Sequence, residues 1–158
     1  MSVEELEKRL KTMEDIEEIK QLQYNYINNL ITTNWDDLID CFAKDGAVDL
    51  HTGFAKGKEE ITKLFKEKIA LTHIGLEGLS VIHPIISVDG DKAMGSWLLD
   101  TKFSKPHKIH LTPPDSGIVD APDWMQGYYE MEYVRENGKW LISQLKWRRR
   151  LKSPRPSE

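Results

Sequence analysis

Four side chains in this sequence could together move a proton on a small organic molecule: Tyr26, His83, Asp100 and Arg149. Removal of water beside a carbonyl needs a base, a donor for the developing enolate oxygen and an acid for the leaving hydroxyl. His83 suits the base role because the unperturbed pKa of histidine lies near neutrality. It lies in an apolar, strand-like run, which leaves two interpretations open: a base or proton shuttle in a pocket, or a core histidine satisfied by one hydrogen bond.

Asp100 and Tyr26 are candidates for the supporting roles. Asp100 follows an apolar run, and a carboxylate there must be paired, solvated in a cavity or placed at a sheet edge. It could fix the tautomer of His83 or act as the base itself, or it could simply pair with Lys102 or another surface cation. Tyr26 lies on an apolar helix stripe, so its hydroxyl needs a partner, either a substrate oxygen or a core group.

Arg149 belongs to the basic run 146–150, in which strand alternation sends Trp147 and Arg149 to the same side. A pocket arginine could bind a carboxylate or carbonyl of the substrate. The alternative is a basic strand end in solvent. Such a short run in an acidic chain gives little reason to expect nucleic acid as a partner.

Aromatic and histidine side chains complete the candidate substrate site. Trp97, Tyr129 and Trp147 are expected to supply aromatic walls, and His51 could lie at the cavity rim. A second pair of imidazoles, at positions 107 and 110, lies in a proline-flanked loop that does not promise metal geometry. We therefore expect lid residues there and no metal.

Hydrophobic periodicity predicts the elements that hold these residues. Apolar residues recur three or four apart and predict one stripe along a long first helix: Leu6, Leu10, Met13, Ile16, Ile19, Leu22, Tyr26 and Leu30. Two short helices are expected around residues 34–45 and 58–69, a short strand at 47–51, and long strands near 72–88, 92–103, 124–136 and 139–150. Asn137-Gly138 supplies the positive φ values of a tight hairpin turn, and Asp89-Gly90 marks another. Residues 104–123 contain four prolines and are expected to form a loop or loose flap.

Composition narrows the class of protein. A chain of 158 residues can form one domain with a buried core, which we place at 1–151, followed by a flexible C-terminal tail at 152–158. The net charge of -4 argues against nucleic acid or an anionic membrane as partner, and no apolar run has the length of a membrane span. The single cysteine, Cys41, cannot form an internal disulfide, so a cytoplasmic location is expected.

The order of these elements, with several short motifs, resembles the SnoaL-like branch of the NTF2-like superfamily, which includes bile-acid 7α-dehydratase and scytalone dehydratase. The resemblance implies an α+β, cystatin-related cone: a long N-terminal helix and two short helices packed on a curved antiparallel sheet around an apolar cavity. The motifs that carry it are Ile19-x-x-Leu22-x-x-x-Tyr26, Trp35-Asp36-Asp37-Leu38-x-x-x-Phe42, Gly57-x-x-x-Ile61, Val88-Asp89-Gly90-Asp91 and Gly127-x-Tyr129 leading into Asn137-Gly138-x-Trp140.

The same resemblance gives the candidate site residues their roles. Tyr26 and Arg149 match the tyrosine and arginine of the related enzymes, and Asp100 falls one position from their strand carboxylate. The helix aspartate of these enzymes is replaced here by Ile31. Their strand histidine falls at Leu79, so either His83 or His73 must be the pocket histidine.

These observations predict a cofactor-free lyase (dehydratase), or a related proton-transfer isomerase or cyclase, for an apolar cyclic or aromatic hydroxy-carbonyl compound. The alternative is a non-catalytic small-ligand-binding or assembly module of the same fold. A homodimer through the sheet is also expected, because long antiparallel sheets with aromatic residues on both sides seldom stay bare.

Overall fold

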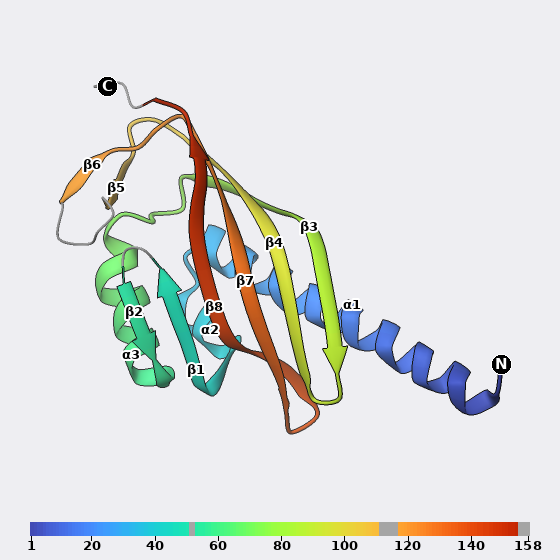
Figure 1. The fold of residues 1–158 in the computed structure, drawn as a ribbon. Helices are drawn as coiled ribbons and strands as arrows, with labels where there is room; N and C mark the ends of the chain where they lie inside the picture. Colours follow the sequence, from blue (N-terminus) through green and yellow to red (C-terminus); the bar gives the residue numbers. More distant parts are fainter. Residues whose placement is uncertain (51–52, 111–116, 155–158) are drawn as a thin grey trace.

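A computed structural model describes residues 1–50, 53–110 and 117–154 of the chain. One helical layer packs against a long, curved sheet (Figure 1), which confirms the predicted α+β cone. The helical segments are α1 (Val3–Ile31), α2 (Trp35–Asp40) and α3 (Gly57–Lys63), and α3 continues into a π-turn, η1 (Leu64–Lys68), and a 3-10 turn, η2 (Ile69–Leu71). The strands are β1 (Phe42–Leu50), β2 (Gly53–Lys56), β3 (Glu77–Asp89), β4 (Lys92–Phe103), β5 (Lys108–His110), β6 (Ile118–Asp120), β7 (Trp124–Glu136) and β8 (Lys139–Lys152).

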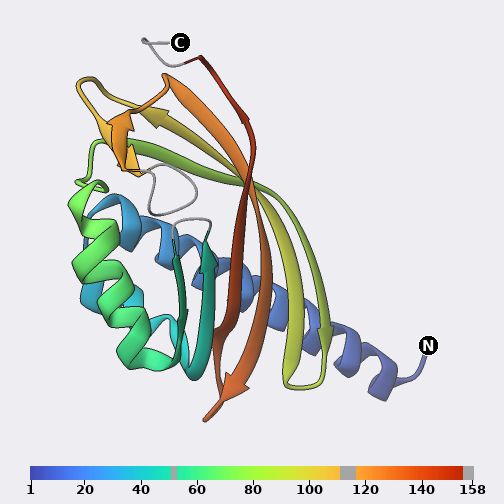
Figure 2. The ribbon, with the colours of Figure 1, turned by 60° about the vertical axis from the view of Figure 1, so that its left-hand side comes forward.

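The main sheet has the order β2-β1-β8-β7-β4-β3. All neighbouring strands are antiparallel except β1 and β8, which run parallel, so the sheet is mixed rather than wholly antiparallel. Both predicted hairpin turns are confirmed: Gly90 joins β3 to β4, and Asn137 and Gly138 join β7 to β8 with positive φ angles. The long hairpins arch over one side of the helices (Figure 2).

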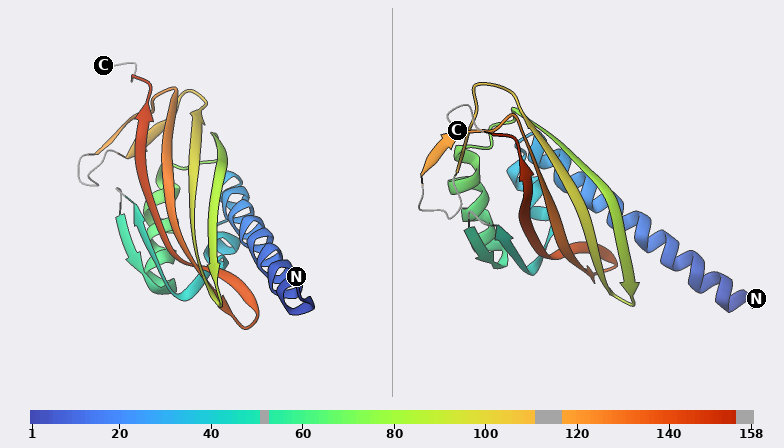
Figure 3. Two further views of the ribbon diagram at one scale, coloured as in Figure 1. Left: turned by 45° about the vertical axis from the view of Figure 1, so that its right-hand side comes forward. Right: turned by 45° about the horizontal axis from the view of Figure 1, so that its top comes forward.

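Helix α1 begins with a complete capping box between Ser2 and Glu5, as its sequence predicts. Its C-terminal half lies across the sheet, whereas its N-terminal half projects beyond the β3 edge (Figure 3). The expectation of one buried stripe along the whole helix is therefore wrong. The face buried against the sheet starts only at Asp15, while Leu6, Leu10 and Met13 are exposed.

A β-bulge interrupts β3 between Ile82 and Ile85. His83 occupies it with a φ of 53°, and the next residue is Pro84, which has no N–H to donate to the ladder. The bulge changes which positions face the core. Leu79 and Val81 pack against the core before it, and Ile86 and Val88 do so after it.

The segment 104–123, which is predicted to be a loop or loose flap, contains a short two-stranded hairpin, β5–β6. The hairpin lies beyond the ends of the short strands β1 and β2 (Figures 1 and 2). The Lys105 ammonium joins the two arms of the segment by donating to the carbonyl oxygens of Ala121 and Pro122. The Ser104 N–H ties the segment to the body by donating to the Leu76 carbonyl. The hairpin is thus held over one end of the cone.

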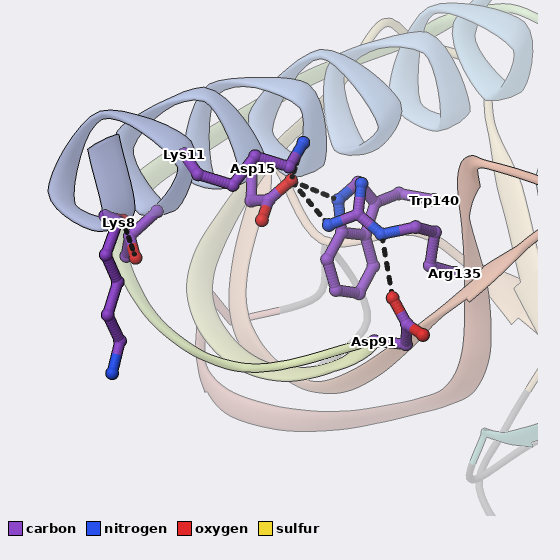
Figure 4. A network of polar contacts seen from close by, with 7 residues as sticks. Lys8, Lys11, Asp15, Asp91, Arg135 and Trp140 are labelled. Atoms are coloured by element: carbon purple, nitrogen blue, oxygen red, sulfur yellow. Dashed lines mark hydrogen bonds and ion pairs between the residues drawn. The ribbon is translucent and has the colours of Figure 1, made fainter. Parts of the chain in front are cut away.

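A polar network fastens the middle of α1 to the far ends of the hairpins (Figure 4). Asp15 is only 4% exposed and accepts from the Arg135 guanidinium at 2.6 Å and from the Trp140 indole N–H at 3.2 Å. Arg135 also donates to Asp91 at 3.0 Å and stacks over the Trp140 ring at 4.5 Å. Lys11 lies 3.1 Å from the same Asp15 oxygen. The three groups that contact this buried carboxylate, Arg135, Trp140 and Lys11, all compensate its charge.

The outer face of the sheet carries apolar side chains, including Ile85 and Met94, which are 73% and 66% exposed. The homodimer expected through this face stays a prediction. Within residues 1–50, 53–110 and 117–154, no helix combines the length and apolar character that a membrane span requires.

Candidate functional site

A cavity of about 180 Å³ lies between the C-terminal end of α1, the π-turn after α3, the sheet and the β5 segment. Most of its wall is apolar, from side chains such as Leu30, Phe65, Leu79, Leu99, Phe103 and Met125. A few polar side chains interrupt this wall: Tyr26, His73, Glu77, Thr101, His107, Tyr129 and Arg149. Apolar walls with a few convergent polar groups are typical of small-molecule sites.

Two tyrosine hydroxyls form the polar part of the inner wall. Tyr26 comes from α1 and Tyr129 from β7, and their rings meet edge to face with centroids 6.3 Å apart. Burial, followed by the interaction with Tyr129, raises the pKa of Tyr26 well above its ordinary value. Burial also raises the pKa of Tyr129. Both hydroxyls therefore stay protonated near neutral pH and can donate to an oxygen in the cavity.

A carboxylate between two histidines forms the opposite polar group. Glu77, at the start of β3, has its Oε1 atom 2.8 Å from Nε2 of His107 and 3.5 Å from Nδ1 of His73. The contact with His107 is close, but the ring N–H is not aligned for a linear hydrogen bond, so its attraction is mainly electrostatic. Glu77 Oε2 has no hydrogen-bond partner in the described part of the chain.

Local backbone geometry brings this cluster together. His73 precedes β3, and Gly75 takes a φ of 81° in the turn that returns the chain to Glu77. That conformation favours glycine, and an added Cβ would approach the Ile31 carbonyl oxygen to 3.4 Å. His107 arrives from the segment before β5 and packs on Phe103, with ring centroids 5.1 Å apart. The hairpin that covers the cavity thereby supplies one of its polar groups.

His73 is held in one tautomer by the end of α1. Its Nε2 atom lies 3.0 Å from the Leu30 carbonyl oxygen, which can only accept, so Nε2 carries the proton and Nδ1 is left with a lone pair. The Trp35 ring packs edge-on against the imidazole at 6.1 Å. Burial lowers the pKa of His73 below its ordinary value of 6.5, although the charge of Glu77 opposes this shift. The imidazole is therefore neutral near pH 7 and able to accept a proton.

Four of the predicted site residues lie on the cavity wall: Tyr26, Tyr129, Trp147 and Arg149. Arg149 is exposed at the mouth, on the same side of β8 as Trp147. Trp97 instead lies in the core beyond the cavity, where its indole N–H donates to the Tyr133 hydroxyl at 3.0 Å. The predicted rim residue His51 lies outside the described residues.

The expectation that His83 faces the cavity is wrong. A regular strand would place it on the side of Leu79, but the bulge gives it a positive φ and leaves its side chain exposed. His73, the alternative that the sequence left open, lines the cavity instead. His83 is therefore not the base of this cavity.

The expectation that Asp100 supports a cavity histidine is also wrong. Strand β4 pairs with β7 without interruption from Lys92 to Lys102, so no bulge shifts its faces. Asp100 consequently points to the outer side of the sheet, where its Oδ1 accepts from the Gln126 amide at 2.7 Å. The inward position next to it is Thr101, which is buried and lines the cavity.

The sequence did not single out Glu77 as a functional residue. It is a lone carboxylate after a glycine-containing turn, and only the tertiary fold places it between two imidazoles. His107 was interpreted as a lid residue, and it does lie on the covering segment, but its side chain is almost fully buried. In the parts of the chain that the structure describes, no set of three or more His, Cys, Asp or Glu side chains is arranged to hold a metal ion.

Known structures share this architecture over nearly the whole chain. One is the hexachlorocyclohexane dehydrochlorinase LinA-type3 from Novosphingobium barchaimii, with 16% identity, coverage of 95% of this chain and 96% of that chain, and a TM-score of 0.73. Another is a proposed scytalone dehydratase from Novosphingobium aromaticivorans, with 14% identity, coverage of 90% and 88%, and a TM-score of 0.70. A protein of unknown function with a cystatin-like fold from Nostoc punctiforme has 21% identity, coverage of 89% and 94%, and a TM-score of 0.68.

At these identities the structural likeness shows the fold and leaves activity open. The family follows from the sequence. A model of the SnoaL-like domain matches residues 11–146, which is most of the chain. The chain therefore belongs to the SnoaL-like domain family.

Proposed function

We propose that the protein is a cofactor-free lyase, or a related proton-transfer isomerase or cyclase, that acts on a small cyclic hydroxy-carbonyl compound in this cavity. The observation that carries the proposal is the neutral His73 imidazole, whose Nδ1 is free to take a proton while Glu77 lies 3.5 Å away. The names of two structural neighbours support it, since a dehydrochlorinase and a dehydratase both catalyse eliminations.

In the proposed reaction, His73 Nδ1 removes the proton next to the substrate carbonyl, and the electrons of that C–H bond form an enolate. The hydroxyls of Tyr26 and Tyr129 donate to the enolate oxygen. The enolate then collapses to a C=C bond as the β C–O bond breaks, and the imidazolium returns its proton to the departing hydroxide as water. The negative charge of Glu77 and the C-terminal end of α1, whose Leu30 carbonyl accepts from Nε2–H, both stabilise the transient imidazolium.

The size of the cavity limits the substrate. An engineered protein cavity of about 150 Å³ accommodates benzene, so 180 Å³ fits one ring with a few substituents. A compound with four fused rings, such as a steroid, is too large for this volume. Arg149 at the mouth could hold a polar substituent of the ring.

A non-catalytic ligand-binding module is the second candidate. Ile31 occupies the position at which the related dehydratases carry an aspartate, and the cavity wall is mostly apolar. In that case the histidines and Glu77 would only tie the covering hairpin to the body. Both candidates predict binding of a one-ring ligand, but only the first predicts turnover that depends on His73.

The test uses β-hydroxycyclohexanone, whose dehydration to cyclohexenone is followed by ultraviolet absorbance. We expect His73→Gln to reduce the rate by about 100-fold or more, because a positioned base contributes typically 10²–10⁴-fold. Glutamine can still donate to the Leu30 carbonyl, so the fold should persist. The matched control, His83→Gln, should keep the wild-type rate because residue 83 is exposed outside the cavity.

Full activity of His73→Gln would exclude this mechanism. Absence of turnover by the wild-type protein, together with a rise in its melting temperature on adding cyclohexenone, would favour the binding module.

A further inference from the structure

The projecting half of α1 carries an apolar stripe that the body of this chain does not cover. Val3, Leu6, Leu10 and Met13 are 67%, 49%, 57% and 67% exposed. Successive helix residues advance by about 100°, which places this stripe roughly opposite the face on which Ile19, Leu22 and Tyr26 pack against the sheet. We call these four residues the N-terminal seam. The seam is open to a partner because its side chains are exposed and because this half of α1 projects beyond the sheet (Figures 1 and 3).

The spacing of the seam is that of a coiled coil. Intervals of three, four and three residues place Val3 and Leu10 at heptad positions a, and Leu6 and Met13 at positions d. In the first heptad, Val3 at a with Leu6 at d is the combination that favours two-stranded pairing. The motif ends at Met13, because the next a position is Glu17, whose carboxylate pairs with Lys20.

The charged residues that flank the seam indicate which helix could pair with it. Arg9 occupies position g and Glu14 the following position e, which face each other across a parallel pair of identical helices. Neither side chain forms an ion pair within residues 1–50, 53–110 and 117–154; Arg9 contacts only the sulfur of Met1. In an antiparallel pair, Arg9 would instead meet Arg9 of the second copy, and Glu7 would meet Glu7.

We propose that the N-terminal seam binds a second copy of this chain as a short parallel coiled coil. Two Arg9–Glu14 pairs flank its apolar residues, and each body stays on the outer side of its own helix. Two heptads bury little surface, so the association is weak and concentration-dependent. This interface is separate from the outer face of the sheet and does not depend on the proposed function.

The test is sedimentation velocity of the full chain over a wide concentration range. We expect a monomer–dimer equilibrium whose dissociation constant rises at least tenfold in Leu10→Glu. Arg9→Glu and Glu14→Arg should each weaken the dimer, and the two changes together should restore it, because the ion pairs re-form with reversed sign. Leu10 is exposed, so circular dichroism and the unfolding midpoint should confirm an intact body in each variant.

Two further variants test the surface and the orientation. Met94→Glu, on the outer sheet face, should leave the equilibrium unchanged. Val3→Cys should form a disulfide-linked dimer on oxidation, whereas the wild type should not, because its only cysteine, Cys41, is buried. A strictly monomeric chain, a dimer sensitive to Met94→Glu and not to Leu10→Glu, or failure of Val3→Cys to cross-link would each overturn the proposal.

Discussion

Two buried carboxylates in this molecule have opposite surroundings. Asp15 and Glu77 are 4% and 5% exposed. Asp15 contacts two cations and an indole N–H, so its negative charge is compensated from three sides (Figure 4). Glu77 contacts two imidazoles, and its second oxygen has no hydrogen-bond partner among the described residues. The first arrangement stabilises the fold, whereas the second leaves one carboxylate oxygen without a hydrogen bond beside a cavity.

The partners of Asp15 and Glu77 show how a structural polar cluster differs from a functional one in this fold. A buried charge with all its partners is expected in any stable protein. A buried carboxylate oxygen without a hydrogen bond costs free energy, and proteins retain such groups mainly where function needs them. The polar clusters are therefore distinguished by their partners rather than by their burial.

The largest expected effect is on stability, from neutralising each carboxylate in turn. Asp15→Asn should lower the free energy of unfolding by about 3 kcal/mol, because it leaves the partly buried Arg135 without its principal partner. Glu77→Gln should leave that free energy unchanged or raise it by up to about 1 kcal/mol, because it removes a buried carboxylate whose second oxygen has no hydrogen-bond partner among the described residues. Urea denaturation of both variants measures the difference. Equal losses of unfolding free energy in Asp15→Asn and Glu77→Gln would show that the two carboxylates do not differ in their contribution to stability.

The second expected effect concerns space in the cavity wall. A Cβ added at Gly127 would lie 2.4 Å from the Trp147 indole nitrogen, so Gly127→Ala must displace this ring. We expect a loss of about 2 kcal/mol in stability and weaker binding of cyclohexenone. The matched control is Gly78→Ala, whose Cβ would meet the Lys102 side chain at an ordinary 3.8 Å. Calorimetry of both variants measures their stability. A larger loss of stability in Gly78→Ala than in Gly127→Ala would contradict this prediction.

The smallest expected effect is that the dehydration rate and the stability of the fold change over different pH ranges. Burial lowers the pKa of His73 below 6.5, so the dehydration rate should stay constant to below pH 6.5 and then fall as His73 is protonated. Burial alone would raise the pKa of Asp15, but hydrogen bonds from Arg135, Lys11 and Trp140 bring it below 3.8. The stability that Asp15 contributes is therefore complete above pH 3.8 and is lost as pH falls through the lower folded-state pKa. Rate profiles and acid denaturation should show these two separate ranges.

Local sequence signals were sufficient to predict the fold. The capping box of Ser2 and Glu5, the turn at Asn137-Gly138 and the apolar periodicities act over a few residues, so they can be recognised without tertiary information. The one large error in the helices was the N-terminal seam. The seam residues have helical spacing, but they lie on a different face of α1 from the residues that pack against the sheet. The intervals between apolar residues do not by themselves show this change of face.

The site was predicted less well because it depends on strand register and tertiary contact. A bulge beside Pro84 turned His83 outward, and an uninterrupted β4 turned Asp100 outward. Tyr26 and Arg149 line the cavity because a regular helix and the uninterrupted stretch of β8 from Gln144 to Arg149 place them there. The contact between Glu77 and His107 joins segments thirty residues apart, and no local pattern marks it.

The protonation state of His73 is tested most directly by nitrogen-15 NMR of its imidazole, which needs no substrate. We predict a neutral ring protonated at Nε2, with a pKa below 6.5 that falls further in Glu77→Gln, because the charge of Glu77 favours the protonated ring. A ring protonated at Nδ1, or a pKa above 6.5 that is insensitive to Glu77→Gln, would contradict the assignment of His73 as a base supported by Glu77.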